Sequence, residues 1–414
     1  MRRVSSGQAN VDVQNNLRTQ ERKLNKVNNQ LGSQQRIQSL RDDPIAAGHL
    51  VRYQSYAKRI EQFKHNAETI SDQFILSEGY VDHSLQIMHR LRELAVTGAH
   101  GVYNKDDLAN MAAEVDELLK EIIQNANALD ADGNALFAGE RSKNQAFIVD
   151  KGNTTGSDSD LIQRVRYNGS IKQNEVEVDE HAYMSVNRSG NQIFWAESQQ
   201  LIAQRDATSY TVLEDAVVSI NGTDISLKTG DSIHGIIAKI NNSGAPVKAS
   251  LDPMSNALML HTTDSRQLWL EDIDGNAFED LGLIKDKSQR PPYNLNDSVL
   301  SSGGSVFDTV IALRNAMLNN DSESIGGKIL GSLDSAIDNL TSSLAELGSK
   351  YERALLNVAR SEKSILNVTS QISREGDLDI TTAITDMKML DYVKNATLST
   401  AGKLYNSTLL NYIR

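Results

Sequence analysis

Apolar residues recur at alternating steps of three and four through residues 329–372, near the end of the chain. Only Ser361 breaks the apolar character of this series. In an α-helix this spacing places a narrow apolar seam on one side and leaves the other sides polar. A seam sustained over about six heptads is typical of coiled-coil packing, so this helix, roughly 65 Å long, is expected to lie against other helices. The series is Leu330, Leu333, Ile337, Leu340, Leu344, Leu347, Tyr351, Ala354, Val358, Ser361, Ile365, Val368 and Ile372.

A second seam with the same spacing predicts a long helix from Pro44 to about Thr97. Gly98 and Gly101 then predict a turn, and a third helix with its own seam follows over residues 108–129. Because the turn is short, the second and third helices are expected to be antiparallel neighbours that pack on the helix of residues 329–372 as a rod. The expected rod core is Ile60, Phe63, Ile70, Phe74, Leu118, Ile122, Leu333, Ile337, Leu340, Leu344 and Leu347.

The two ends of the chain also have helical patterns, but weaker ones. Residues 10–31 follow a heptad in which Asn10 and Gln20 are polar, and residues 379–414 keep no single strict register. Amphipathic helices that do not complete a core within one chain are typical of assembly elements. The residues expected to pack between subunits are Val13, Leu17, Leu24, Val27, Leu31, Leu398, Leu404, Tyr405, Leu409 and Tyr412.

The middle of the chain, residues 135–299, is rich in Gly, Asn, Ser and Asp and has short alternating runs that predict strands. Within it, residues 211–284 resemble a separate unit, with a strand pair around the Asn221-Gly222 turn, a short helix over 231–241 and a second strand pair over 247–261. The predicted fold class is α+β, with a long antiparallel helical bundle or coiled-coil rod built from both chain ends and an inserted β-rich region. The expected parts are terminal assembly helices (1–40 plus 377–414), the rod (41–134 plus 300–376), a β-rich domain (135–210 plus 285–299) and the insert (211–284).

Composition narrows the possible partners. The chain has 42 Lys and Arg against 54 Asp and Glu, a formal net charge of -12, which argues against nucleic acid or an anionic membrane as the main partner. The absence of cysteine excludes a disulfide framework and thiolate chemistry. No apolar run reaches the ~18–20 residues of a membrane span, and the basic start lacks the apolar stretch of a signal peptide. We therefore expect no nucleic-acid partner, no membrane insertion and no cleaved signal peptide.

The sequence offers no convincing set of catalytic or metal-binding residues. His83 and His89 are six residues apart on a predicted helix, which places them on different faces. The acidic stretch at residues 130–134 lacks the glycine and the glutamate that a calcium loop needs at its sixth and twelfth positions. We expect no metal, no cofactor and no enzymatic activity.

Several short segments resemble the family of flagellar hook–filament junction proteins, the third hook-associated protein. Arg36-Ile37, followed by Asp42-Asp43-Pro44 and then Ile45-Ala46-Ala47, is similar to that family's RI…DDP[VI]AA segment. Asp43 before Pro44 also suits a helix cap followed by a proline in the first turn. Residues 136–139 are similar to the family's LFxG, and further similar segments lie at 306–309, 320–321, 333–334, 344–348 and 409–412. The resemblance covers roughly residues 1–145 and 300–414, and residues 211–284 are similar to the IN-type insert of flagellins and the filament cap protein.

This resemblance implies a structural protein of the bacterial flagellum. It implies a homo-oligomeric ring that joins the hook, through the first hook-associated protein, to the flagellin filament. It also implies that the terminal helices pack together only on assembly, with a flagellar export chaperone binding the C-terminal region. The implied location is the hook–filament junction, extracellular or periplasmic, reached by type III export.

Three other hypotheses remain open. The chain could be a flagellin filament subunit, although flagellins usually have DDAAG where this chain has Asp42-Asp43-Pro44-Ile45-Ala46. From a different class, the helices could belong to a soluble coiled-coil signalling scaffold. A carbohydrate-active or proteolytic role for the β-rich insert is the weakest hypothesis, because neither paired carboxylates nor a nucleophile set supports it.

Overall fold

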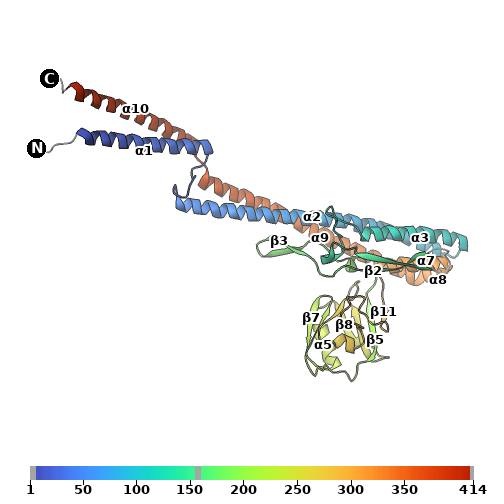
Figure 1. Cartoon of the computed structure of the whole chain (residues 1–414). Coiled ribbons are helices and arrows are strands. Elements are labelled where there is room, and N and C mark those ends of the chain that lie inside the picture. The colour runs from blue at the N-terminus through green and yellow to red at the C-terminus, as the bar shows by residue number, and fades with distance from the viewer. Residues whose placement is uncertain (1–5, 154–159, 411–414) are drawn as a thin grey trace. The chain divides into compact units, whose positions relative to one another are not determined.

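The chain combines long helices with antiparallel strands (Figure 1). The structure, a computed structural model, describes residues 6–153 and 160–410, with side chains for residues 11–153 and 160–403. Contacts divide it into two compact units, residues 1–65 with 358–414 and residues 66–357. The mixed helix-and-sheet class expected from the sequence is confirmed, whereas the coiled-coil rod and the division into four parts remain predictions.

The long helices begin and end at local sequence signals. α2 begins at Pro44 directly after Asp43, whose Oδ1 accepts a hydrogen bond of 3.1 Å from the amide of Ala46. α3 follows a capping box formed by Asn104 and Asp107, and α9 ends at Gly376. The helices predicted over residues 10–31, 44–97 and 329–372 are thus confirmed. Their bounds, with those of three further helices, are α1 Ser6–Ser33, α2 Pro44–Ala99, α3 Lys105–Ala126, α7 Val306–Leu318, α9 Leu330–Gly376 and α10 Ile380–Leu410.

In α2 the predicted seam is buried from Ile60 to Ala95, and only its first position, Tyr56, is exposed. An ion pair joins α2 to α9 in each unit. Lys64 Nζ lies 2.8 Å from Glu362 Oε1 in the first unit, and Arg92 Nε lies 2.6 Å from Asp334 Oδ1 in the second. α2 and α9 are therefore neighbours in both units.

The buried stripe of α9 differs from the predicted seam at some of its positions. Positions seven apart, from Leu333 to Val368, are buried as expected. Between them the stripe shifts by one residue at three places, where the small or polar Ala336, Ser343 and Asn357 are buried and the larger seam residue that follows each is only half-buried. Of the expected core residues, Ile60, Phe63, Ile70, Phe74, Ile122, Leu333, Leu340 and Leu347 are buried, and Leu118, Ile337 and Leu344 are half-buried.

α3 packs on α7, a neighbour that the seam pattern did not assign to it. Arg314 of α7 is only 1% exposed, and its Nη1 lies 2.8 Å from Asp116 Oδ1 of α3. Its Nη2 donates a hydrogen bond of 2.7 Å to the main-chain oxygen of Ile162 in strand β2. α7 buries side chains on several sides, so it links α3 to the β-rich part of the same unit.

The strands form four antiparallel sheets. β1 pairs with β2 and β3 with β4, while the larger sheets have the orders β10-β6-β7 and β11-β5-β9-β8. The strand bounds are β1 Phe147–Asn153, β2 Asp160–Tyr167, β3 Glu175–Asp179, β4 Ala182–Ser185, β5 Gln200–Asp206, β6 Ala216–Ile220, β7 Thr223–Leu227, β8 Val247–Leu251, β9 Ala257–Thr262, β10 Leu270–Asp274 and β11 Leu300–Ser302. Four short helices lie among the strands: η1 Gly139–Arg141, α4 Gly190–Ile193, α5 Ile233–Asn242 and α6 Ala277–Asp280. Two more, α8 Ser322–Ser324 and the π-helix η2 Ile325–Ile329, lie between α7 and α9.

The strand pairs predicted within residues 211–284 are confirmed. β6 and β7 meet at Asn221 and Gly222, both with positive φ, and β8 pairs with β9. The hydrophobic core of this part also takes in β5, from Leu201 onward, because β5 pairs with β9. The core therefore begins before residue 211.

An aromatic cluster gathers segments from distant parts of the second unit. Phe137 and Phe147 pack against Phe194, and Phe147 also packs against Phe307 at 4.9 Å between ring centroids. Gly139, two residues after Phe137, has a φ of +61°. A Cβ at this position would lie 2.2 Å from the main-chain oxygen of Ser170. The LFxG segment thus combines a buried aromatic ring with a glycine that close packing requires.

Candidate functional site at the chain ends

α1 and α10, the first and last helices of the described chain, lie side by side in the first unit (Figure 1). Gln20 Nε2 donates a hydrogen bond of 3.4 Å to Thr397 Oγ1, and Lys394 Nζ lies 3.6 Å from Glu21 Oε1. On α1 the half-buried residues are those of the predicted heptad, including Val13, Leu17, Leu24, Val27 and Leu31. This α1 seam therefore has its partner within the same chain.

The side of α10 that faces α1 combines small and polar residues with the half-buried apolar Met387, Leu390 and Val393. Lys394 and Thr397 contact α1, and Ala383 and Ala401, on the same side at heptad spacing, are buried. Backbones can approach closely where side chains are small, and the backbones of α1 and α10 do lie close together along this side. Part of the seam that holds α10 is thus built from small or polar residues, which a search for large apolar side chains does not find.

Other large apolar side chains of α10 lie away from this covered side. Tyr392 is 77% exposed and Met389 65%, and they are neighbours three residues apart. Ile384 and Leu398 are separated by fourteen residues, close to four helical turns, so they share another side with Ile380. A helix with apolar residues all round is normally covered on all sides, but within the described chain only one side of α10 is covered.

Of the predicted assembly residues in the last part of the chain, Leu398 is the one whose side chain the structure describes. Leu398 lies on an uncovered side and is 47% exposed. Leu404, Tyr405 and Leu409 lie in the helix, but their side chains are outside the described ones, and Tyr412 lies outside the described residues. Ile384, Met389 and Tyr392 were not singled out from the sequence, because they keep no register with the neighbouring apolar positions.

Two short connectors join this helix pair to α2 and α9. Residues 34–43 lead from α1 to α2, and residues 377–379 lead from α9 to α10. Gln35 and Asp377 form an antiparallel bridge, flanked by the bonds Arg36 N to Gly376 O (2.8 Å) and Leu378 N to Gln34 O (3.0 Å). The connectors therefore form one short ladder between segments far apart in sequence.

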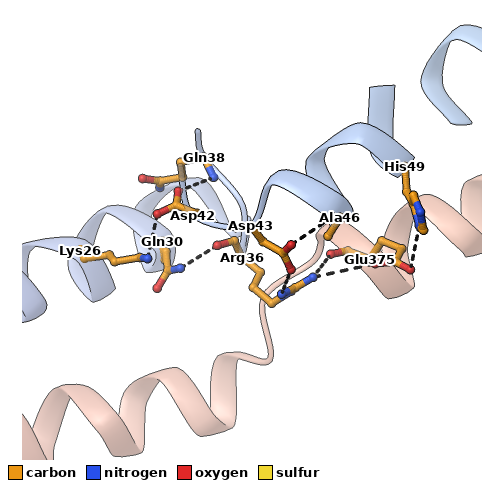
Figure 2. A network of polar contacts seen from close by, with 9 residues as sticks. All are labelled: Lys26, Gln30, Arg36, Gln38, Asp42, Asp43, Ala46, His49 and Glu375. Carbon is orange, nitrogen blue, oxygen red and sulfur yellow. Dashed lines mark hydrogen bonds and ion pairs between the residues drawn. The ribbon is translucent and has the colours of Figure 1, made fainter. Parts of the chain in front are cut away.

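Arg36 is the side chain with the most links across this ladder (Figure 2). Its Nη2 donates a hydrogen bond of 2.7 Å to the main-chain oxygen of Glu375, and its Nη1 lies 3.5 Å from Asp43 Oδ2. Gln30 Nε2 donates to the main-chain oxygen of Arg36 at 2.6 Å. Arg36 thus connects α1, the start of α2 and the end of α9, where a cation suits the negative end of the helix dipole.

Asp42 and Asp43 hold the connector in different ways (Figure 2). Asp42 lies 2.7 Å from Lys26 Nζ and accepts hydrogen bonds from the amides of Gln38 and Ser39, and these partners, Lys26 first, lower the pKa of Asp42 to about 2. Asp43 caps α2, and the bond from the amide of Ala46, followed by Arg36, lowers the pKa of Asp43. Both carboxylates are therefore charged well below neutral pH.

A small apolar cluster supports the connectors. Ile37 packs with Ala46, Ala47 and Leu50. A Cβ at Gly376 would lie 3.1 Å from Leu50 Cδ2, so glycine lets the end of α9 approach this cluster. The residues of the predicted motif, Arg36, Ile37, Asp42, Asp43 and Pro44, thus meet at one place, whereas their partners Lys26, Gln30 and Glu375 had no local signal in the sequence.

The described residues contain no group of three or more His, Cys, Asp or Glu side chains placed to hold a metal ion. Among the helices of the described chain, none is both long and apolar enough to span a membrane.

Two family models match the chain. The bacterial flagellin N-terminal helical region matches residues 4–142, and the flagellin hook IN motif matches residues 216–264. The second match lies inside the segment where this resemblance was expected. In these two segments the chain is similar to flagellins.

Individual relatives narrow this class. Flagellar hook-associated protein 3 of Escherichia coli is 23% identical over 47% of this chain and 59% of its own length. Polar flagellin B/D of Vibrio parahaemolyticus is 23% identical over 97% of this chain and 98% of its own. A hook-associated protein-3 structure from Legionella pneumophila has a TM-score of 0.46 and 16% identity, covering 78% of this chain and 97% of that one. The predicted resemblance is confirmed, because the chain is related to flagellar hook-associated protein 3 and to flagellins.

Proposed function

We propose that this chain is a structural subunit of the bacterial flagellum, placed at the joint between hook and filament. The observation that carries the proposal is the apolar character of α10 on sides that no described part of the chain covers. In a chain related to proteins of flagellar assemblies, further copies are the natural cover for such a helix. The terminal helices α1 and α10 would then be the elements through which copies form a ring.

The partners follow from the same proposal. The first hook-associated protein would lie on the hook side of the ring and flagellin on the filament side. A flagellar export chaperone would bind the C-terminal region before export, and the protein would be located at the hook–filament junction, extracellular or periplasmic. The ion pairs between α2 and α9 support a helical rod made of residues 41–134 and 300–376, with the β-rich parts attached to it.

A second candidate function is that of a flagellin filament subunit. The specific observation in its favour is the similarity to the Vibrio flagellin, which extends over 97% of the chain, whereas the similarity to the Escherichia coli hook-associated protein covers 47%. A filament subunit would use the same terminal helices, so the two candidates differ in partners rather than in fold.

A deletion strain separates the candidates. If the chain is a junction subunit, its loss leaves hooks without filaments and flagellin released outside the cell body. If it is a filament subunit, hooks keep a junction, and the purified chain grows long filaments by itself. Intact, motile flagella in the deletion strain would contradict both candidates.

A further inference from the structure

The ladder between the two connectors has a geometry that can be tested directly. In an antiparallel pair, two residues flanked by hydrogen bonds on both sides but not bonded to each other have Cα atoms about 4.5 Å apart. Gln35 and Asp377 are such a pair, because the flanking bonds run from Arg36 N to Gly376 O and from Leu378 N to Gln34 O. The two connectors are therefore in direct contact with each other.

Two backbone hydrogen bonds alone form a weak ladder, since isolated strand pairs are marginal in water. The guanidinium of Arg36 adds a third link, to the main-chain oxygen of Glu375, and reaches Asp43 from its other nitrogen. This oxygen is one of the last four carbonyls of α9, which have no partner within the helix. A lysine has one nitrogen and cannot make both contacts with the geometry of the arginine fork.

The surrounding contacts fix Arg36 itself. Gln30 holds its main-chain oxygen from the last turns of α1, and Ile37 beside it is buried in the cluster with Leu50. Glu375 is in turn within 3.8 Å of His49 Nδ1 on α2. α1, α2 and α9 thus each have a contact that leads to Arg36 or to its partner Glu375.

We propose that the connectors form a latch that holds the end of α1 and the beginning of α10 in register in the free chain, and that Arg36 is the positioning residue that closes it. With the latch closed, the two terminal helices are ordered or released together rather than one at a time. The inference goes beyond the proposed function, because it concerns a single chain and applies to a junction subunit and a filament subunit alike.

The test uses the absence of native cysteine in the full-length chain. In the double variant Gln35→Cys with Asp377→Cys, the separation expected for this pair suits a disulfide. We expect rapid intramolecular oxidation of the purified monomer, measured as effective concentration against glutathione, and much slower oxidation in concentrated urea. Adding Arg36→Met is expected to lower that effective concentration about three- to tenfold, and Arg36→Lys is expected to fall between the two.

Arg90→Met is the matched control, because Arg90 also forms exposed ion pairs, with Glu93 and Glu114, but lies in the second unit. It should leave the oxidation of the cysteine pair unchanged. Hydrogen exchange of Arg36→Met without the added cysteines provides a second measurement, in which α1 and α10 should lose protection together. Equal oxidation with and without Arg36, or loss of protection in one helix alone, would overturn the latch.

Discussion

Arg314 of α7 and Asp116 of α3 form an ion pair of 2.8 Å inside the second unit, although 198 positions separate them in the sequence. Arg314 is 1% exposed, and its other contact, with the main-chain oxygen of Ile162, ties the pair to β2. A buried pair contributes little net stability compared with apolar residues, but losing one partner leaves a buried charge without compensation. The pair therefore determines how α3, α7 and β2 fit together.

We expect Arg314→Met to lower the free energy of unfolding by about 3 kcal/mol, because Asp116 keeps its charge in a buried place. Lys120 Nζ, 3.0 Å from Asp116 Oδ2, compensates only part of that charge. Urea unfolding followed by circular dichroism measures the change. Arg90→Met, which breaks exposed pairs, should cost less than about 1 kcal/mol. Equal losses for the two variants would show that burial of the Arg314 pair has no special effect.

Leu340→Asp is expected to lower the melting temperature of the purified monomer strongly. Leu340 is fully buried in the stripe of α9, so the variant places a carboxylate among apolar side chains at a cost of several kcal/mol. Leu356→Asp is the control on the same helix, since Leu356 is 65% exposed, and it should change the free energy by no more than about 0.5 kcal/mol. A similar melting temperature for both variants would contradict the packing of α9.

Leu398→Asp is expected to abolish motility while leaving the melting temperature of the monomer nearly unchanged. The reason is that Leu398 lies on a side of α10 that is uncovered in the chain but would be covered by neighbouring copies in the assembly. Asn395→Asp is the control, because Asn395 is exposed one turn away and is already polar. Swimming assays in a complemented deletion strain make the comparison. Full motility with Leu398→Asp would refute assembly through this side of α10.

The stability of the connector of residues 34–43 is expected to depend on pH through Asp42. Its pKa is lowered from 3.8 to about 2 by Lys26 and by the amides of Gln38 and Ser39, so the charged form belongs to the folded connector. The stabilisation from this carboxylate is therefore complete above about pH 4 and is lost as the pH falls from about 4 towards 2. Hydrogen exchange of residues 34–43 measures it, with Asp42→Asn as the reference.

At neutral pH the connector should exchange more slowly in the native chain than in Asp42→Asn. Below about pH 2 the two should exchange alike, because protonated aspartate accepts hydrogen bonds no better than asparagine. A difference that stayed constant from neutral pH to pH 2 would contradict the low pKa of Asp42.

The sequence alone predicted the long helices and the two strand pairs β6–β7 and β8–β9. Pro44, the capping box before α3 and Gly376 act within a few residues, so their effect does not depend on the rest of the chain. The same holds for the Asn221-Gly222 turn between β6 and β7. The motif from Arg36 to Pro44 could also be found, but only as a string of residues without partners.

Sequence pattern could not decide which side of a seam packs more closely. In α9, Ala336 and Ser343 are buried, whereas the larger Ile337 and Leu344 are half-buried. The sequence pattern predicted the opposite, because it assigns the larger apolar residue to the seam whatever lies opposite. Contacts with the β-rich part determine which residues of α9 are buried. Asn357 Nδ2, for example, lies 3.2 Å from Met184 Sδ of β4. Because Met184 and Asn357 are 173 positions apart in the sequence, no local sequence pattern could have predicted this contact.

The chain ends show the same division. Heptad spacing determined that α1 has one apolar seam, and the α+β class followed from the change of pattern after residue 134. Only the tertiary structure decided that small residues such as Ala383 and Ala401 belong to the side of α10 that meets α1, and that Met389, Tyr392 and Leu398 stay uncovered. It also decided that Arg36 meets Glu375 across 339 positions. The physical reason is that spacing along a helix fixes which residues share a side, whereas the partner of each side depends on how distant segments pack.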